Sequence, residues 1–233
     1  MDVLFDGLAD AIGLLVTGDQ DSWSIMLLTM RVSLTATAIA LLVGVPLGAA
    51  LALARFPGRR IVLAAANTGM GMPPVVVGLF VTVLLWRSGP LGGLGLLYTP
   101  AAMVVAQAAI ATPIVVALVT AALQQVDPDF RVQMQALGAT AARAFAALLS
   151  EARLPLLAAA MAAFGAVVSE VGAAQMVGGN LAGQTRVLTT AAVLATSRGQ
   201  FSLAIAFGLI LLLIAFGVNL SLTLMQQQRT VPR

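Results

Sequence analysis

Long apolar stretches separated by short polar segments dominate the sequence. A helix of about 20 apolar residues spans the hydrocarbon core of a bilayer. Five stretches reach or exceed that length, at residues 24–54, 61–86, 101–123, 154–177 and 201–225. The second is interrupted by Pro73 and Pro74, which cannot donate helix hydrogen bonds. The pattern predicts an all-α, polytopic membrane helix bundle with about five transmembrane helices, in a domain of residues 21–225.

Residues 1–20 carry an amphipathic pattern instead. Apolar residues recur on one helical face and aspartates on another: Leu4, Leu8, Ile12 and Leu15 on the first, Asp2, Asp6 and Asp10 on the second. Such a division favours a short helix that lies in the membrane interface. A mobile acidic terminus is the alternative.

A polar-faced insert at residues 124–153 separates the third and fourth apolar stretches. Asp127 has the side chain of an N-cap, and Pro128 suits the first helical position. Gly138 can end that helix in the left-handed conformation, and Thr140 can cap a second helix. The insert is therefore predicted to be a compact helical hairpin, which is a suitable docking surface for another protein.

The arginines are distributed unevenly along the chain. The first thirty residues contain five aspartates and no arginine. With five spans and the N-terminus outside, eight arginines fall on the cytoplasmic side: Arg55, Arg59, Arg60, Arg131, Arg143, Arg153, Arg229 and Arg233. Because cytoplasmic loops carry an excess of basic residues, this topology is favoured. It places the hairpin and the tail of residues 226–233 in the cytoplasm.

Composition supports the membrane class and removes several kinds of chemistry. Hydrophobic residues make up 60% and charged residues 9% of the 233 residues, and Cys, His and Lys are absent. Cys and His metal sites, a His proton relay and a Cys nucleophile are thereby excluded. A Walker A phosphate loop needs its lysine, so ATP-driven activity has to take its hydrolysis from a partner. We expect no catalytic residue, metal site or cofactor in this chain, and no nucleic acid partner.

Pro73 and Pro74 are candidates for a translocation path. Adjacent prolines free helix carbonyls at membrane depth, which is tolerated only where protein or a water-filled cavity covers them. We therefore expect a broken helix that lines the path. An ordinary proline kink without a transport role is the alternative.

Glu170 lies inside the fourth apolar stretch, where a carboxylate is costly unless it is paired or faces a cavity. Arg31 in the first stretch is expected at similar depth, so the two are predicted to form an ion pair within one chain or across a dimer. A pair that only locks helices together is the alternative. Since a carboxylate repels an oxyanion, a role in gating is expected for Glu170 rather than anion coordination.

Glycines, amide donors and an arginine gather in the segment that follows. Its candidate path or gate residues are Gly178, Gly179, Asn180, Thr185 and Arg186. Backbone N–H groups, amides and guanidinium are the donors that an oxyanion would meet. A plain turn with Arg186 in the headgroup layer is the alternative.

These residues leave three classes of function in competition: an ATP-powered importer permease, a secondary transporter or channel, and a membrane-embedded scaffold or enzyme. Secondary transporters usually carry several intramembrane acids and internal repeats, and Glu170 is the single acid of this kind here. A membrane enzyme needs a nucleophile or a metal cluster. The importer permease is favoured.

The hairpin resembles the cytoplasmic loop of ATP-binding-cassette (ABC) importer permeases. That loop places a Glu-Ala-Ala start six residues before a glycine, with a Leu-Pro further on. Here the core is residues 132–138, closed by Leu154 and Pro155. Val132 replaces the family's Glu, and the distance from Gly138 to Pro155 is about one helical turn longer than usual.

Four further stretches are similar to tungstate-uptake permeases, namely RFPGRR (55–60), MPPVVVGL (72–79), residues 87–100 and residues 169–201. The resemblance implies a type I importer permease that forms a homodimer in the bacterial cytoplasmic (inner) membrane. It also implies two ABC ATPase subunits, which hold ATP and Mg, and an extracytoplasmic binding protein that delivers tungstate. Molybdate or another tetrahedral oxyanion is the alternative substrate, and a secondary anion transporter is the less favoured class.

The resemblance assigns the contact with the ATPase to the hairpin. The expected coupling residues are Asp129, Gln135, Ala136, Leu137, Gly138 and Ala139.

The topology can be tested by cysteine labelling, because the chain has no Cys of its own. In intact cells an impermeant thiol reagent is expected to label Asp10→Cys and Asn180→Cys. It should leave Arg59→Cys and Gln135→Cys unlabelled until the membrane is permeabilised. Labelling of Arg59→Cys from outside would overturn the arrangement with an outside N-terminus.

Overall fold

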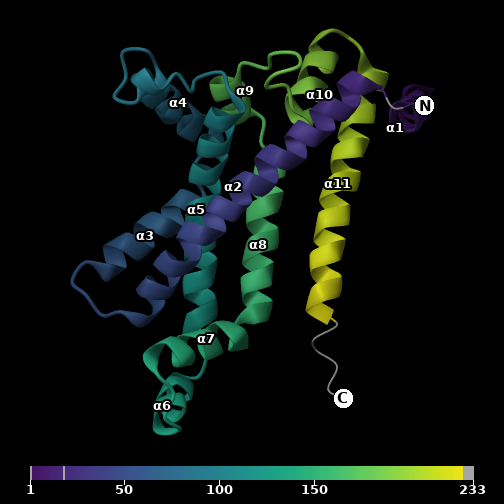
Figure 1. Ribbon diagram of the computed structural model, residues 1–233. Coiled ribbons are helices and arrows are strands. Elements are labelled where there is room, and N and C mark those ends of the chain that lie inside the picture. The colour runs from purple at the N-terminus through teal and green to yellow at the C-terminus, as the bar shows by residue number, and fades with distance from the viewer. Residues whose placement is uncertain (1, 18, 228–233) are drawn as a thin grey trace.

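A computed structural model describes residues 2–17 and 19–227, and in this part of the chain the regular elements are all helices (Figure 1). They are α1 (Asp2–Thr17), α2 (Gln20–Leu53), α3 (Arg59–Met70), α4 (Pro74–Leu85), η1 (Gly92–Leu94), α5 (Pro100–Gln124), α6 (Pro128–Ala136), α7 (Ala141–Glu151), α8 (Arg153–Val168), α9 (Gly172–Gly178), α10 (Leu188–Ser197) and α11 (Phe201–Gln227). Most of the predicted tail of residues 226–233, including Arg229 and Arg233, lies outside the described residues.

Three helices are long and apolar enough to cross a membrane alone, namely α2, α5 and α11. Two bent pairs can each act as one further span, so the number of spans is three to five. One pair is α3 with α4, bent by 104° at the predicted proline break, and the other is α7 with α8, bent by 68°. The all-helical membrane fold predicted from the sequence is confirmed.

Two features of the second half differ from the sequence interpretation. The fourth apolar stretch is interrupted, because α8 ends at Val168 and α9 begins at Gly172. Residues 188–197, expected within a loop, form α10. Hydropathy alone indicates one continuous span over residues 154–177, because the side-chain cap of Glu170 on Ala173 and the bond from Thr189 to the Glu170 carbonyl do not alter the apolar pattern.

The most extensive helix packing in the described residues is between α2 and α5. Gly44 lies against Val115 and Gly48 against Val119, so the two helices run in the same direction. A Cβ added at Gly48 would lie only 2.8 Å from the carbonyl oxygen of Val116, which is why this position holds glycine. Small residues let membrane helices approach this closely. The hydroxyl of Thr120 donates a hydrogen bond to the carbonyl of Gly48 at 3.1 Å, and this bond stabilises the crossing.

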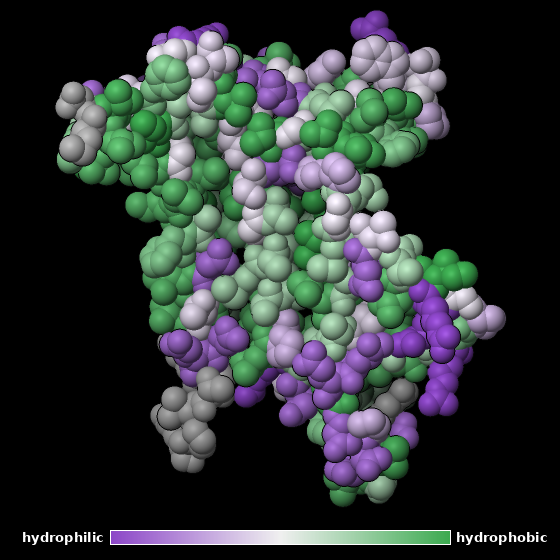
Figure 2. Space-filling model, turned by 180° about the vertical axis from the view of Figure 1, so that it is seen from behind, coloured by the Kyte–Doolittle hydropathy of each residue, from purple (hydrophilic) through white to green (hydrophobic). Residues whose placement is uncertain are grey.

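The two ends of the molecule have different characters. The end of α4 and the start of α5, with α9 and α10, lie at the N-terminal end, whereas α6 and α7 lie at the opposite end, where α11 finishes (Figure 1). Hydrophobic residues cover much of the middle, and hydrophilic residues gather around the α6–α7 end (Figure 2). The start of α2 and the end of α11 at opposite ends fit an odd number of spans, while the orientation in the membrane stays a prediction.

The predicted N-terminal helix is present as α1. Its Gly7 is buried against Ile205 of α11, while Leu4, Leu8 and Ile12 are exposed. The helix therefore has one face packed on α11 and another free to enter a membrane interface.

The α2–α5 crossing predicts a difference between two glycine substitutions. Gly48→Ala should destabilise the protein by about 1–3 kcal/mol, because the added methyl group meets backbone atoms of α5. Gly165→Ala in α8 is the matched control, since a Cβ there meets no atom within 4 Å and alanine favours the helix. The measurement is thermal unfolding of the purified protein in detergent. Equal melting temperatures for the two variants would contradict the close crossing.

Candidate functional site

The two interrupted helices meet at their broken ends. Val75 is the second residue of α4 and directly follows the two prolines, and Gly172 begins α9 two residues after Glu170. A Cβ added at Gly172 would lie 2.6 Å from Cγ2 of Val75. One turn further along, Gly78 of α4 packs against the backbone of Ala173. The structure thus brings two candidate path features together, the proline break and the Glu170 break, which are almost a hundred residues apart in sequence.

The proline break is formed as the sequence predicts. Pro73 is the N-cap residue of α4, Pro74 occupies its first turn, and no helix hydrogen bond is lost because the first N–H groups of a helix have no intrahelical partner. The carbonyl of Pro73 accepts the N–H of Val76 at 2.9 Å. On the other side, Gly69 allows α3 to pack against Pro113 of α5.

The carboxylate of Glu170 is a helix cap. Its Oε1 accepts the N–H of Ala173 at 2.9 Å, so it satisfies a donor in the first turn of α9. The carbonyl of Glu170 accepts the hydroxyl of Thr189 at 2.9 Å, which connects the break to α10. The start of a helix favours a carboxylate both by hydrogen bonding and by its dipole.

The predicted Arg31–Glu170 ion pair is not formed within the described chain. The Arg31 side chain is exposed on α2, and Glu170 binds the α9 backbone instead. The reason is that Glu170 lies three residues before an unsatisfied N–H group, which is nearer than any guanidinium. Pairing of Arg31 across a dimer stays a prediction.

Two threonines that the sequence analysis did not single out fix the start of α10. Thr29 of α2 accepts the N–H of Leu188 at 2.9 Å through its hydroxyl, and Thr189 holds the carbonyl of Glu170. Their signal in the sequence was a polar side chain inside an apolar segment, which needs a partner at membrane depth. Which partner each would find could be learned only from the tertiary structure.

The glycine-rich loop after α9 is held by its own polar groups. Thr185 is buried, and its hydroxyl donates to the carbonyl of Gly178 at 2.5 Å and accepts the N–H of Leu181 at 2.9 Å. The guanidinium of Arg186 donates to Asn180 Oδ1 at 3.2 Å. Gly179 and Asn180 both adopt left-handed backbone conformations, with φ of 71° and 52°. The predicted donors are thus gathered in one loop, but its own carbonyl and amide oxygens already occupy several of them.

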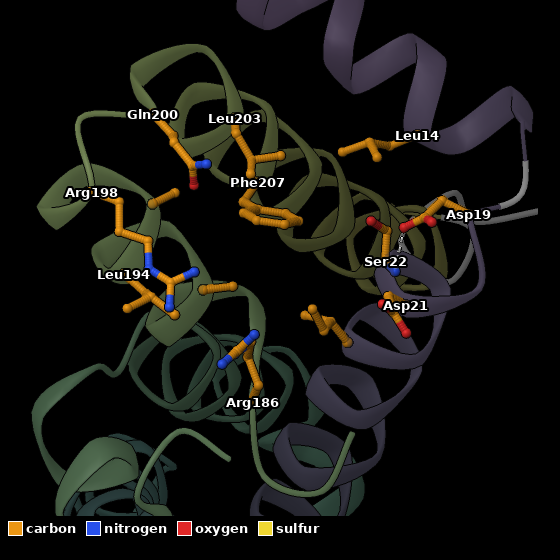
Figure 3. Close-up of a pocket in the computed structure, with 13 residues that line it drawn as sticks. Leu14, Asp19, Asp21, Ser22, Arg186, Leu194, Arg198, Gln200, Leu203 and Phe207 are labelled. Atoms are coloured by element: carbon orange, nitrogen blue, oxygen red, sulfur yellow. Dashed lines mark hydrogen bonds between the residues drawn. The ribbon is translucent and has the colours of Figure 1, made fainter. Parts of the chain in front are cut away.

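Arg186 also lines a cavity of about 320 Å³ between α2, α10 and α11 (Figure 3). Arg198 points into the same cavity from the end of α10, and Asp19 and Asp21 lie across from it on α2. The Ser22 hydroxyl and N–H both hydrogen-bond the Asp19 carboxylate and hold its pKa below its usual value. The charges of the two guanidinium groups and the two carboxylates cancel. The cavity therefore has no net charge that would attract a dianion.

One further residue connects the segment between η1 and α5 to α9. The N–H of Tyr98 donates to the carbonyl of Val177 at 2.8 Å, and its ring lies against Gly179. Tyr98 has φ of 64°, which is rare for a bulky side chain. Sequence reasoning missed it because nothing in the sequence marks a tyrosine for this conformation.

The hairpin of α6 and α7 has the predicted geometry. Asp127 accepts the N–H of Asp129 at 2.8 Å and caps α6. Gly138 follows α6 with φ of 81°, and the Thr140 hydroxyl accepts the N–H of Arg143 at 3.4 Å and caps α7. The prediction of helix, left-handed glycine and capped helix is therefore confirmed residue by residue.

The coupling residues predicted on the hairpin form its exposed tip. Asp129, Gln135, Ala136, Leu137 and Gly138 are exposed, and Ala139 is half-buried. Leu137 has 82% of its surface accessible, the largest exposed fraction among the described large apolar residues. At the base of the hairpin, Leu148 of α7 is buried in the same apolar cluster as Val119 of α5 and Ala152. The tip is therefore free to bind a partner while its base is fixed to the membrane helices.

In residues 2–17 and 19–227, no three His, Cys, Asp or Glu side chains gather closely enough to hold a metal ion.

The chain has relatives among known transport proteins. Residues 44–230 match the family described as binding-protein-dependent transport system inner membrane component. The tungstate uptake system permease protein TupB of Peptoclostridium acidaminophilum is 36% identical over 228 residues, covering 98% of this chain and 100% of the relative. A probable anion ABC transporter permease protein of Haloferax volcanii is 39% identical over 201 residues, covering 84% of this chain and 87% of the relative.

The fold also has a counterpart among solved structures. A chain of the MetNI methionine ABC transporter, in an inward-facing conformation, matches with a TM-score of 0.72 at 19% identity. The match covers 94% of this chain and 99% of that chain. The chain therefore has the type I importer permease fold that the sequence resemblance implied.

The cap formed by Glu170 leads to a prediction. Glu170→Ala leaves the Ala173 N–H without an acceptor, so the protein should lose about 1–3 kcal/mol of stability. Glu170→Gln should retain most of it, because the amide oxygen still accepts the bond. The measurements are unfolding in detergent and hydrogen exchange at the start of α9. Arg31→Ala is the control and should leave α9 protected; if it exposes α9 as much as Glu170→Ala does, the two residues are paired after all.

Proposed function

The chain belongs to the family of binding-protein-dependent transport system inner membrane components, and from this membership we propose that it is the membrane-spanning permease subunit of an ATP-driven tungstate importer. The observation that carries the proposal is the likeness to a tungstate uptake permease over the whole length of both chains. Molybdate has the same charge and a similar tetrahedral shape, and it is the alternative substrate.

The partners follow from the two ends of the molecule. The exposed hairpin tip around Leu137 binds the ATPase, of which the complex contains two copies holding ATP and Mg. At the opposite end an extracytoplasmic binding protein delivers the anion. A second copy of this chain completes a homodimer, which the uncovered apolar side chains of α3 and α4 support: Ile61, Val62, Val75, Leu79, Phe80 and Val83 are exposed in the single chain.

The hairpin passes movement to the membrane helices through packed side chains. Leu148 of α7, Val119 of α5 and Ala163 of α8 belong to one buried apolar cluster. A displacement of the tip by the ATPase therefore moves the lower part of α8. Movement of α8 reaches the interruption before α9, and α9 is in contact with α4 through Gly172 and Gly78. The junction of the two broken helices is the gate in this mechanism.

The chemistry at this junction suits brief contact with an oxyanion. Ser169 is exposed beside the break, but its hydroxyl already donates to the carbonyl of Gly165 at 2.8 Å, so the junction offers an oxyanion few free hydrogen-bond donors and holds it only weakly. Glu170 is engaged with the start of α9, so its carboxylate shapes the gate and takes no part in holding the anion. Tight binding at this point would slow release, and selectivity accordingly rests with the binding protein.

Uptake in reconstituted vesicles tests the proposal. With permease, ATPase and binding protein present, tungstate uptake should require ATP on the hairpin side and should persist in excess sulfate. The permease alone should hydrolyse no ATP, since a lysine-containing phosphate loop is absent from the sequence. Uptake without the binding protein, or a preference for a metal cation, would refute the importer. A preference for molybdate would leave the proposed mechanism unchanged and identify molybdate as the substrate.

The same vesicles test the hairpin through Gly138. Leucine at φ of 81° is strained by roughly 1–2 kcal/mol, so Gly138→Leu should distort the turn and reduce uptake by about five- to thirtyfold. Gly138→Asn is the matched control, because asparagine tolerates the left-handed conformation and should retain most of the uptake. No atom lies within 4 Å of the added Cβ, so overpacking does not complicate the result. Normal uptake by Gly138→Leu would remove the hairpin from the coupling mechanism.

A further inference from the structure

A second concave site lies at the end of the molecule opposite the hairpin. It encloses about 300 Å³ between the end of α4 and the segment that leads into α5. Its lining is formed by Leu85, Trp86, Arg87, Gly92, Gly95, Leu97 and Tyr98. This volume is at the lower limit for small-molecule pockets, and it suits one or two side chains of a partner protein.

The pocket is built by a rigid loop. The N–H of Gly89 donates to the carbonyl of Trp86 at 2.7 Å, and the N–H of Leu91 donates to the carbonyl of Leu84 at 2.9 Å. A Cβ at Gly89 or Gly92 would collide with the backbone carbonyls of Val83 or Trp86. The loop therefore folds back tightly over the end of α4, and its shape does not depend on a partner to form.

The pocket is also connected to the gate. Tyr98 forms one wall, and its backbone is fixed to Val177 at the end of α9, while its ring lies on Gly179. A tyrosine with φ of 64° is held in an unfavourable conformation by its surroundings, and such strain is concentrated at functional sites. A molecule that fills the pocket and presses on Tyr98 acts directly on the end of α9.

The exposed side chains around the pocket are of the types that carry binding energy between proteins. Trp86 is 50% and Tyr98 is 44% exposed, and Arg87 is exposed beside them. Tryptophan, tyrosine and arginine are the residues most enriched at the centres of protein interfaces. Arg87 has no carboxylate among the other residues that line its pocket, whereas Arg186 lines a cavity together with Asp19 and Asp21. Arg87 therefore offers a positive charge that calls for a carboxylate from outside the chain.

We propose that this pocket, lined by Trp86, Arg87 and Tyr98, is the docking site for the extracytoplasmic binding protein, which inserts an apolar side chain flanked by a carboxylate. The inference rests on the proposed function, because the family's dependence on a binding protein requires a docking surface at this end. Docking presses on Tyr98 and, through Val177 and Gly179, displaces α9 at the gate. The partner's carboxylate binds Arg87 and fixes its orientation.

The test is the affinity of the purified binding protein encoded beside the permease gene for the permease–ATPase complex in lipid nanodiscs. Trp86→Ala and Arg87→Glu should each raise the Kd at least about tenfold. The loss of affinity caused by Arg87→Glu should become smaller as the salt concentration is raised, because salt screens the interaction between charges. Basal ATP hydrolysis of the complex should remain, which shows that the variants fold and assemble.

Trp23→Ala is the matched control, since Trp23 is the other tryptophan and is 42% exposed near the same end of the molecule. Its Kd should be unchanged. Aromatic residues also anchor proteins in the membrane interface. If Trp86→Ala and Trp23→Ala have equal effects, or if the Kd is unaffected by Arg87→Glu, the pocket is a membrane anchor and the proposal is wrong.

The binding measurement is independent of the transported ion. A complex that fails to import tungstate but still binds the binding protein through Arg87 refutes the proposed substrate and keeps the docking site. A complex that imports tungstate with unaltered affinity in both pocket variants refutes the docking site alone.

Discussion

The close parallel crossing of α2 and α5 is the contact on which the rest of the structure depends. Small residues on α2 allow it, and α2 then contributes to each of the three apolar clusters: Ala36 and Ala40 in the first, Val32 in the second, Ile25 and Met26 in the third. The first cluster extends to the base of the hairpin and the second to the gate. Because both functional ends are packed against the same helix, neither can be positioned without this crossing.

The second constraint is that a helix end at membrane depth must find hydrogen-bond partners, since lipid offers none. The structure satisfies this constraint with hydrogen bonds from both neighbouring and distant residues at the same place. Glu170 caps the helix that follows it, whereas Thr29 and Thr189 satisfy groups more than fifteen residues away in the sequence. The result is a junction of two broken helices held by a few hydrogen bonds. Such a junction can rearrange at lower cost than a continuous helix, as a gate requires.

The two ends of the molecule are prepared for partners in different ways. The hairpin exposes a small apolar tip on a rigid base, and its one adaptable point is a left-handed glycine. The opposite end has a preformed pocket whose wall, Tyr98, is already attached to α9. Forces applied at either end therefore converge on α9, one through α8 and the other through Tyr98. That convergence is the physical basis on which we propose that ATP hydrolysis and substrate delivery act on one gate.

The sequence by itself determined the features that depend on local chemistry. Hydropathy located α2, α5 and α11, the adjacent prolines located the break between α3 and α4, and the order of Asp127, Pro128, Gly138 and Thr140 specified the hairpin, because caps and turns are made by neighbouring residues. Tertiary structure alone decided what depends on distant partners. It joined the carbonyl of Glu170 to Thr189 and left Arg31 exposed, it formed α10 where a loop was expected, and it put Tyr98 on Gly179. A polar side chain in an apolar segment indicates that a hydrogen-bond partner is needed. Only the packed fold determines which partner comes within hydrogen-bonding distance.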